Sequence, residues 1–151
     1  MCREFQETRA VWVRFPYVIG EDDYTGRLRF YIEHVMRHQS IACANPGTSG
    51  SFIDSGEAGN FLAFLAKKSY VGPVNAACKG VLSIDGICSF VTKRTGIEPV
   101  FSAEGEASPY DIPVEYCLDT GVAKSLGYAF QPIETKLHDI IDYMIDSGED
   151  V

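Results

Sequence analysis

The chain has 151 residues, of which 46% are hydrophobic and 23% are charged, and its formal net charge at pH 7 is −8. This length fits one domain with a sizeable core, and no apolar run approaches the roughly 20 residues that a membrane span needs. The excess of acidic side chains, 21 against 13 basic ones, repels polyanions and argues against nucleic-acid binding. We therefore expect one domain over residues 1–151 that binds neither nucleic acid nor membranes.

Cysteine usage points to a reducing compartment. The five cysteines are odd in number and form no CxxC pair or zinc-binding spacing, which favours free thiols. The first nine residues, MCREFQETR, are polar and lack the apolar core of a secretory signal. Together these features predict a cytoplasmic protein. The cysteines are Cys2, Cys43, Cys78, Cys88 and Cys117.

The first predicted element is a strand over residues 10–19, AVWVRFPYVI. Its seven large apolar or aromatic side chains are interrupted only by Arg14 and Pro16, a pattern typical of a strand buried on both faces of a sheet. Burial of seven such side chains contributes roughly 10–20 kcal/mol, so they must be covered. We expect the isolated chain to hide this strand in a homodimer formed through residues 11–19. Arg14, inside such a strand, needs an acidic partner or a ligand.

Helices and short strands alternate along the rest of the chain. Apolar residues at i, i+3, i+4 and i+7 predict the helices, and apolar runs between turn-forming residues predict the strands. In chain order we expect a helix over 25–38, a strand over 40–45, a helix over 55–68, a strand over 72–78, a helix over 83–95, a strand over 97–103, an irregular stretch over 104–113, a helix over 119–127 and a helix over 134–146. This interleaving indicates an α/β fold with about five helices.

Local signals fix several helix ends and faces. Thr25 and Ser55 are the expected N-caps of the first two helices, and Gly96 is the expected stop of the third. Pro99 lacks a backbone donor, so its strand belongs at a sheet edge. The expected buried stripes are Ala58, Phe61, Leu62 and Leu65 in the second helix and Leu137, Ile140, Ile141, Met144 and Ile145 in the last.

The chain lacks the motifs of common cofactor and catalytic sites. It contains neither GxGxxG nor GxxxxGK(S/T), the loops that hold a pyrophosphate. None of the eight tyrosines has a lysine four residues later, and Ser49 in GTSGS does not fit the GxSxG pattern of a nucleophile elbow. We therefore assign no catalytic residue.

Two histidines and two acidic pairs remain as candidates for metal binding or acid–base chemistry. His34 and His38 have i, i+4 spacing but lack the HExxH pattern, so a solvated helix face is their expected role. The acidic pairs lie in loops without apolar surroundings, and solvation is again the expected role. No metal site is predicted. The pairs are Asp22 with Asp23 and Glu104 with Glu106.

The order of the segments resembles the C-terminal part of extended short-chain dehydrogenases/reductases, the NAD-dependent epimerase/dehydratase family that acts on nucleotide sugars and related substrates. The late Rossmann strand and following loop of that family are similar to VRFPYVIGEDD, and its Phe-Val-His-Val-Asp-Asp segment and helix to SFIDSGEAGNFLAFLA. Its next strand, Ser-capped helix and glycine stop are similar to GPVNAACKGVLSIDGICSFVTKRTG, and its closing helices to LDTGVAKSLGYAFQPIETKLHDIIDYMI. The similarity extends from about Thr8 to Ile145.

This resemblance implies that the chain is the second half of a two-part enzyme. A missing N-terminal half would supply the dinucleotide-binding Rossmann domain and the Tyr-x-x-x-Lys pair. The full-length enzyme would use NAD or NADP, and this chain alone would bind neither. Phe15, Pro16 and Tyr17 are then expected near the nicotinamide, with Arg27 and Ser51 toward the substrate.

Two residues depart from the family pattern. Gly50 stands where the family often has an arginine that meets a nucleotide phosphate, and Asp54 replaces the histidine of the Phe-Val-His run. The first hypothesis is the substrate-binding portion of an NAD(P)-dependent epimerase, dehydratase or reductase acting on a nucleotide sugar or related small molecule, not catalytically competent alone. The alternative is a stand-alone, non-catalytic binding or interaction module with the same fold. A complete small hydrolase would need a nucleophile and a base that the sequence does not offer.

Overall fold

The computed structural model describes residues 10–110 and 112–147. Within them the chain forms an α/β structure with five helices, as expected, and nine short strands. The helices are α1 (Arg27–Met36), α2 (Ser55–Leu65), α3 (Ile84–Thr95), α4 (Gly121–Ser125) and α5 (Ile133–Asp146). The strands are β1 (Val11–Arg14), β2 (Tyr17–Ile19), β3 (Ser40–Ala42), β4 (Ser49–Gly50), β5 (Phe52–Asp54), β6 (Gly72–Asn75), β7 (Leu82–Ser83), β8 (Val100–Phe101) and β9 (Glu106–Ala107).

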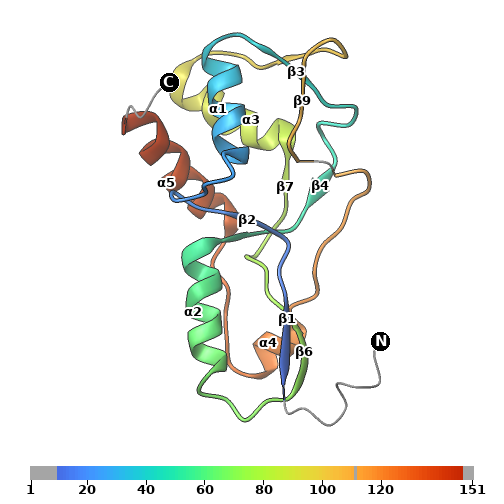
Figure 1. The fold of residues 1–151 in the computed structure, drawn as a ribbon, viewed down its shortest axis with the longest axis vertical. Helices are drawn as coiled ribbons and strands as arrows, with labels where there is room; N and C mark the ends of the chain where they lie inside the picture. Colours follow the sequence, from blue (N-terminus) through green and yellow to red (C-terminus); the bar gives the residue numbers. More distant parts are fainter. Residues whose placement is uncertain (1–9, 111, 148–151) are drawn as a thin grey trace.

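The elements form two groups along the long axis of the molecule (Figure 1). Helices α1, α3 and α5 lie with β3 and β9 in one group, and β1 and β6 lie with α2 and α4 in the other. Strand β2, which runs parallel to β5, lies between the two groups. The sheets are small: parallel β1–β6, parallel β2–β5, parallel β8–β3–β9 and antiparallel β4–β7.

Pro16 separates β1 from β2 and so divides the strand predicted over residues 10–19. Proline has no backbone N–H and a fixed φ, so it cannot continue a hydrogen-bonded ladder. β1 runs parallel to β6, whereas β2 runs parallel to β5 with Tyr17 opposite Phe52. At Pro16 the chain therefore leaves the β1–β6 sheet and enters the β2–β5 sheet.

The expectation that this segment is buried on both faces is wrong for the chain by itself. Trp12 is 40% exposed, Phe15 is 36% exposed, and Arg14 also lies at the surface. The reason is that β1 pairs with β6 alone among the described residues, so one edge of β1 has no neighbouring strand there. Ile19 in β2 is fully buried. Because Arg14 is exposed, it needs no buried acidic partner.

One hydrophobic cluster joins α1, α3 and α5 to the strands. The buried stripe predicted for α5 is confirmed at four positions, and Ile145 packs against the cluster while partly exposed. These helices bury their apolar faces against one another, which is what amphipathic helices of this length require for stability. The buried residues of α5 are Ile133, Leu137, Ile140, Ile141 and Met144.

Helix α2 packs through aromatic residues. Phe61 lies 4.9 Å from the ring centroid of Tyr128 and 5.0 Å from that of Phe130, and Phe64 lies 5.0 Å from Tyr128. Turning this face inward leaves Leu62 on the outer side, where it is 46% exposed, so its predicted burial is wrong. The other predicted stripe residues are buried or packed against the cluster, namely Ala58, Phe61 and Leu65.

The caps of α1 and α2 each lie one residue from the predicted position. α1 follows Gly26, whose left-handed φ of 66° suits glycine, and not Thr25. α2 is capped by Asp54, whose carboxylate accepts the backbone N–H of Glu57 at 2.9 Å, whereas Ser55 is the first helical residue. In each pair, Thr25 with Gly26 and Asp54 with Ser55, both residues are of types that can cap a helix. The sequence alone therefore does not decide which of the two does so, whereas the backbone direction of the preceding loop or strand does.

Helix α3 begins and ends where the sequence predicts. Oγ of Ser83 accepts the backbone N–H of Gly86 at 3.0 Å, and Gly96 ends the helix with a φ of 76°. Strand β8 lies at an edge of its sheet, as Pro99 predicts. The stretch 104–113 is not wholly irregular, since β9 within it pairs with β3.

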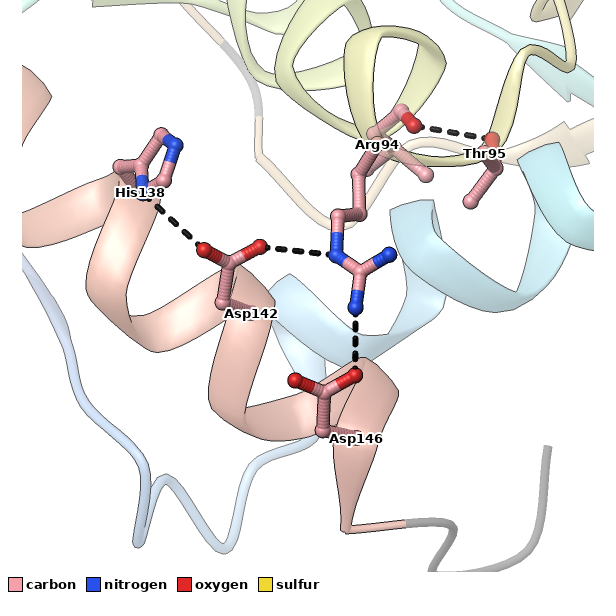
Figure 2. A network of polar contacts seen from close by, with 6 residues as sticks. Arg94, Thr95, His138, Asp142 and Asp146 are labelled. Carbon is pink, nitrogen blue, oxygen red and sulfur yellow. Dashed lines mark hydrogen bonds and ion pairs between the residues drawn. The ribbon is translucent and has the colours of Figure 1, made fainter.

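Ion pairs and hydrogen bonds connect α3 to α5 (Figure 2). Nε of Arg94 donates to Oδ1 of Asp142 at 3.2 Å, and its Nη2 donates to Oδ1 of Asp146 at 2.6 Å. Asp142 also lies 3.1 Å from Nδ1 of His138, one turn earlier on α5. A single guanidinium group thus holds two carboxylates of the facing helix.

His34 is buried, and its expected role on a solvated helix face is wrong, whereas His38 is exposed. Nδ1 of His34 lies 2.8 Å from the carbonyl oxygen of Phe30, and the two rings stack with centroids 3.7 Å apart. Nε2 lies 3.3 Å from Oε2 of Glu106 in β9. Spacing along the helix could not reveal this because the strand that covers His34 comes from far along the chain.

Cys43, Cys78, Cys88 and Cys117 are free thiols, and Cys2 lies outside the described residues. Within the part of the chain that the structure describes, no group of histidine, cysteine and carboxylate side chains could hold a metal ion. None of the helices found there has the length and apolar character to cross a membrane.

Candidate functional site

A cluster of aromatic rings around Tyr110 joins β2, β5 and α1. The ring centroid of Tyr110 lies 5.0 Å from that of Tyr17, 5.3 Å from that of Phe52 and 5.6 Å from that of Tyr31. Tyr110 follows β9 in the loop SPYDIP and is only 1% exposed. This loop therefore packs against the segment that carries the predicted nicotinamide-facing residues.

Arg27 lies over two rings of the cluster. Its Cζ is 5.3 Å from the ring centroid of Tyr110 and 6.0 Å from that of Tyr17, close enough for cation–π attraction. Its Nε donates to Oγ1 of Thr25 at 3.0 Å, and Thr25 donates in turn to Oδ1 of Asp23 at 2.5 Å. The guanidinium group is thus held in place by two rings and a hydroxyl group.

Burial raises the pKa of two tyrosines in the cluster. It raises the pKa of Tyr31 to about 12, and it raises the pKa of Tyr110 as well, although the nearby Arg27 cation opposes the shift. These groups can donate hydrogen bonds at neutral pH but cannot serve as bases. The hydroxyl of Tyr110 and Oδ2 of Asp23 are buried without a hydrogen-bond partner in the described part of the chain.

A cavity of about 330 Å³ opens where the loop after β2 meets the start of α2. Asp22, Asp23, Arg27 and Ser55 are among its lining residues, and Oγ of Ser55 donates to Oδ1 of Asp22 at 3.3 Å. Asp22 is exposed, as expected, but Asp23 is half-buried. Carboxylate acceptors beside one cation suit a small molecule that carries hydroxyl groups.

Two further cavities share Ala42, Cys43 and Ala44, which end β3 and follow it. Their volumes are about 220 Å³ and 370 Å³, enough for several water-sized groups each. The first is also lined by Asn45, Ile84, Ala107, Ser108, Tyr110 and Ile112, and the second by Phe101, Ser102 and Ala103. Cys43 is the only ionisable thiol in either lining.

Residues 115–118 cover β4 and the start of β5. The backbone N–H of Tyr116 donates to the carbonyl of Ser49 at 3.2 Å, and the Tyr116 hydroxyl donates to the carbonyl of Ser51 at 3.3 Å. Oγ of Ser51 accepts the backbone N–H of Leu118 at 2.9 Å. Ser51 is fully buried, so its hydroxyl holds this segment in place.

The structure brings two predicted site residues, Tyr17 and Arg27, into direct contact. Phe15 and Pro16 lie just beyond the carboxyl end of β1, and Ser51 lies beside Phe52, which pairs with Tyr17. Contacts of these residues with a cofactor or substrate stay predictions. Sequence reasoning missed Tyr110, which joins the site from a loop between two prolines. An aromatic residue in so polar a stretch was the signal that could have found it.

No family model matches the sequence, and no curated protein matches it. Solved structures do match its fold. UDP-glucose 4-epimerase from Thermotoga maritima, solved with UDP-glucose, superposes with a TM-score of 0.72 and 18% identity over 92% of this chain and 47% of the enzyme. UDP-N-acetylglucosamine 4-epimerase from Methanobrevibacter ruminantium, solved with UDP-N-acetylmuramic acid, superposes with a TM-score of 0.73 and 17% identity over 95% and 49%. dTDP-glucose 4,6-dehydratase from Bacillus anthracis, solved with NAD, superposes with a TM-score of 0.75 and 9% identity over 93% and 46%.

The chain has the fold of the C-terminal portion of these enzymes. It spans about half of their length. The resemblance to extended short-chain dehydrogenases/reductases drawn from the order of segments is therefore confirmed at the level of the fold. The similarity covers at least nine-tenths of this chain in all three comparisons.

Proposed function

We propose that the chain is the substrate-binding portion of an NAD(P)-dependent epimerase, dehydratase or reductase acting on a nucleotide sugar or related small molecule. The observation that carries this is the superposition of nearly the whole chain on only about half of each enzyme. The chain also lacks the glycine-rich fingerprint and the Tyr-x-x-x-Lys pair. It is therefore not competent alone, and a second half holds the dinucleotide. Its free thiols fit a cytoplasmic enzyme.

The positions of Phe15, Pro16, Tyr17 and Arg27 support the proposed roles. Ligands of parallel α/β sheets bind outside the carboxyl ends of the strands, and Phe15 and Pro16 directly follow the carboxyl end of β1. Tyr17 begins β2 beside them, so these three residues would face the nicotinamide. Arg27 lines the cavity next to Tyr17 and would meet the substrate. Ser51 is buried and would act indirectly, because its hydroxyl accepts the backbone N–H of Leu118 and so holds the segment that follows Tyr116.

The edge of β1 is the surface that the dinucleotide-binding half would cover. Trp12 is 40% exposed beside a strand edge that has no partner among the described residues. Exposed strand edges with apolar side chains readily pair with another chain. In the absence of the other half, the same edge would pair with a second copy and give a homodimer.

One observation favours the second candidate, a stand-alone binding or interaction module. The described residues form one connected buried cluster to which helices and strands both contribute. Such a chain can fold without a second half. The two candidates differ in whether the native protein carries a dinucleotide.

The deciding experiment is immunoprecipitation from the native host with an antibody against this chain. The enzyme proposal predicts a polypeptide of about twice 16.7 kDa, or this chain with a second one of similar mass, because a dinucleotide-binding half has about 100–150 residues. Denaturation should release NAD or NADP. A lone 16.7 kDa species without dinucleotide would contradict it and favour the module. As a control, calorimetry on the isolated chain should detect no micromolar binding of either dinucleotide.

A further inference from the structure

We propose that His34 and Glu106 form a pH-sensitive contact that holds strand β9 and the loop after it on helix α1. The contact forms when the imidazole of His34 carries two protons, and it weakens when the imidazole loses one of them. Both residues belong to this chain, so the contact does not depend on the proposed function. The hydrogen-bonding partners of the two ring nitrogens decide which protonation state the fold favours.

Both ring nitrogens of His34 face acceptor atoms. Nδ1 lies 2.8 Å from the carbonyl oxygen of Phe30, and a carbonyl oxygen can only accept, so Nδ1 carries a proton. Nε2 lies 3.3 Å from Oε2 of Glu106. In a neutral imidazole with its proton on Nδ1, Nε2 is an acceptor as well, and it would face the carboxylate with no proton between them. The contact therefore needs a second proton.

That second proton belongs on His34. Carboxyl groups in water are ionised at neutral pH, and the side chain of Glu106 is 71% exposed. The side chain of His34 is buried, and its ring stacks on that of Phe30 with centroids 3.7 Å apart, so packing holds the imidazole in place. When the second proton is lost, Glu106 is thus the partner that can turn away into water.

The ionisable groups on the elements packed against α1 have partners elsewhere, are buried or lie exposed at the surface. Helices α3 and α5 contact α1, and β3, which also contacts it, consists of uncharged residues. At the end of α1, Arg37 pairs with Glu33 at 3.8 Å. Glu106 is thus the charged group that the fold places against the imidazole. The paired or buried groups of α3 and α5 are Arg94 with Asp142 and Asp146, Lys93 over the ring of Phe90, and Cys88.

Helix α1 holds residues 106–110 at two points. His34 contacts Glu106, and the hydroxyl of Tyr31, three residues earlier on the same face of the helix, accepts the backbone N–H of Tyr110. Weakening of the first contact should therefore let this segment open more often from α1. The ring of Tyr110 lies 5.3 Å from Cζ of Arg27, so the protonation state of His34 would also affect the support of Arg27.

Hydrogen exchange of backbone amides, followed by NMR, tests this contact. The N–H groups of Ser108 and Tyr110 are both hydrogen-bonded and report on the opening of the segment. The N–H of Cys78 donates to the carbonyl of Phe52 at 3.0 Å, beside β5, and serves as the reference amide. The imidazole resonances of His34 report its protonation in the same samples, and protection factors correct for the intrinsic dependence of exchange on pH.

Protection at Ser108 and Tyr110, relative to Cys78, should be greatest while His34 carries two protons. It should fall by about two- to fivefold as pH rises through the titration of His34, the range expected for one partly exposed ion pair. A ratio that stays constant or increases through this titration would overturn the proposal. The same holds if the His34 resonances show no titration while the chain stays folded.

Glu106→Gln is the variant that separates this contact from a general effect of pH. An amide can donate to a neutral Nε2 and accept from a protonated one, so the variant should keep the contact in both states and lose the pH dependence. Glu104→Gln removes the same charge from an exposed position two residues earlier and should retain the pH dependence. Wild-type behaviour of Glu106→Gln, or loss of the pH dependence in Glu104→Gln, would contradict the assignment of the effect to this pair.

Discussion

The hydroxyl of Tyr31 accepts the backbone N–H of Tyr110 at 3.1 Å and so joins α1 to a loop 79 residues further along the chain. The hydroxyl also lies 2.6 Å from Oγ of Ser108, which itself donates to the carbonyl of Tyr110 at 2.9 Å. Because the single proton of Ser108 is used in that bond, Tyr31 must donate to Ser108. The loop that completes the aromatic cluster is thus held by a closed set of hydrogen bonds.

This arrangement predicts a loss of stability at alkaline pH. Burial raises the pKa of Tyr31 from 10.0 to about 12, so between these values the unfolded chain loses the proton while the folded chain keeps it. The free energy of unfolding is therefore unaffected by this group below pH 10 and falls as pH rises toward 12, by roughly 3 kcal/mol at most. Urea unfolding at a series of pH values would measure it.

Tyr31→Phe isolates this contribution. The variant should lose about 1–3 kcal/mol at neutral pH, because the N–H of Tyr110 is left buried without a partner. Its stability should then fall less steeply than that of the wild type above pH 10. Tyr143→Phe, at a 48% exposed position, is the matched control for removal of a hydroxyl. Parallel stability curves for Tyr31→Phe and the wild type would contradict the prediction.

The ion pairs that Arg94 makes between α3 and α5 should contribute a modest, salt-sensitive amount to the free energy of unfolding. The Arg94 side chain is 45% exposed and its guanidinium group pairs with Asp142 and Asp146, and exposed pairs contribute about 0.2–1 kcal/mol each. Arg94→Ala should therefore lower the free energy of unfolding by about 1 kcal/mol at low ionic strength and by less in molar salt. Arg37→Ala, which breaks a 3.8 Å pair between the C-cap residue of α1 and Glu33, should lose less. Equal losses in both variants would show that the contact between the helices adds nothing.

Alanine substitutions at two glycines should change the stability of the chain in opposite directions. A Cβ at Gly105 would collide with the backbone carbonyl of Ser40, so Gly105→Ala should destabilise the chain by about 1–3 kcal/mol. Gly59 lies inside α2 with open space around its Cα, and Gly59→Ala should stabilise it by about 0.5–1 kcal/mol. Thermal unfolding of the two variants measures both signs. Stabilisation by Gly105→Ala would refute the close packing of this loop on β3.

Elements with local signals were predictable from the sequence. The bounds of α3 follow from the Ser83 cap and the Gly96 stop, and the buried face of α5 follows from its apolar spacing. The two-residue strands β4, β7 and β9 exist only because distant segments pair, so local residue patterns could not indicate them. Their prediction would have required knowledge of the tertiary fold.

The candidate site was predictable only in part for the same reason. Tyr17 and Arg27 come from one stretch of sequence and were recognised through the resemblance of that stretch. Tyr110 and Tyr116 reach the site from a proline-containing loop that has no periodicity. The exposure of Trp12 could not be predicted from the sequence either. An apolar run shows that a strand needs neighbouring strands or side chains to cover it, but not whether the same chain supplies them.

The exposed edge of β1 gives the last prediction, that the isolated chain self-associates through Trp12. Lysine on an edge strand disfavours pairing with another strand, so Trp12→Lys should give a monomer where the wild type gives a dimer by light scattering. Trp12 is 40% exposed, so the substitution also removes the burial of the rest of the ring, and the monomer should become somewhat less stable. Tyr24→Lys, at a 98% exposed position away from the edge, should leave the dimer intact. A wild-type chain that stays monomeric at high concentration would contradict the prediction and show that β1 tolerates an open edge.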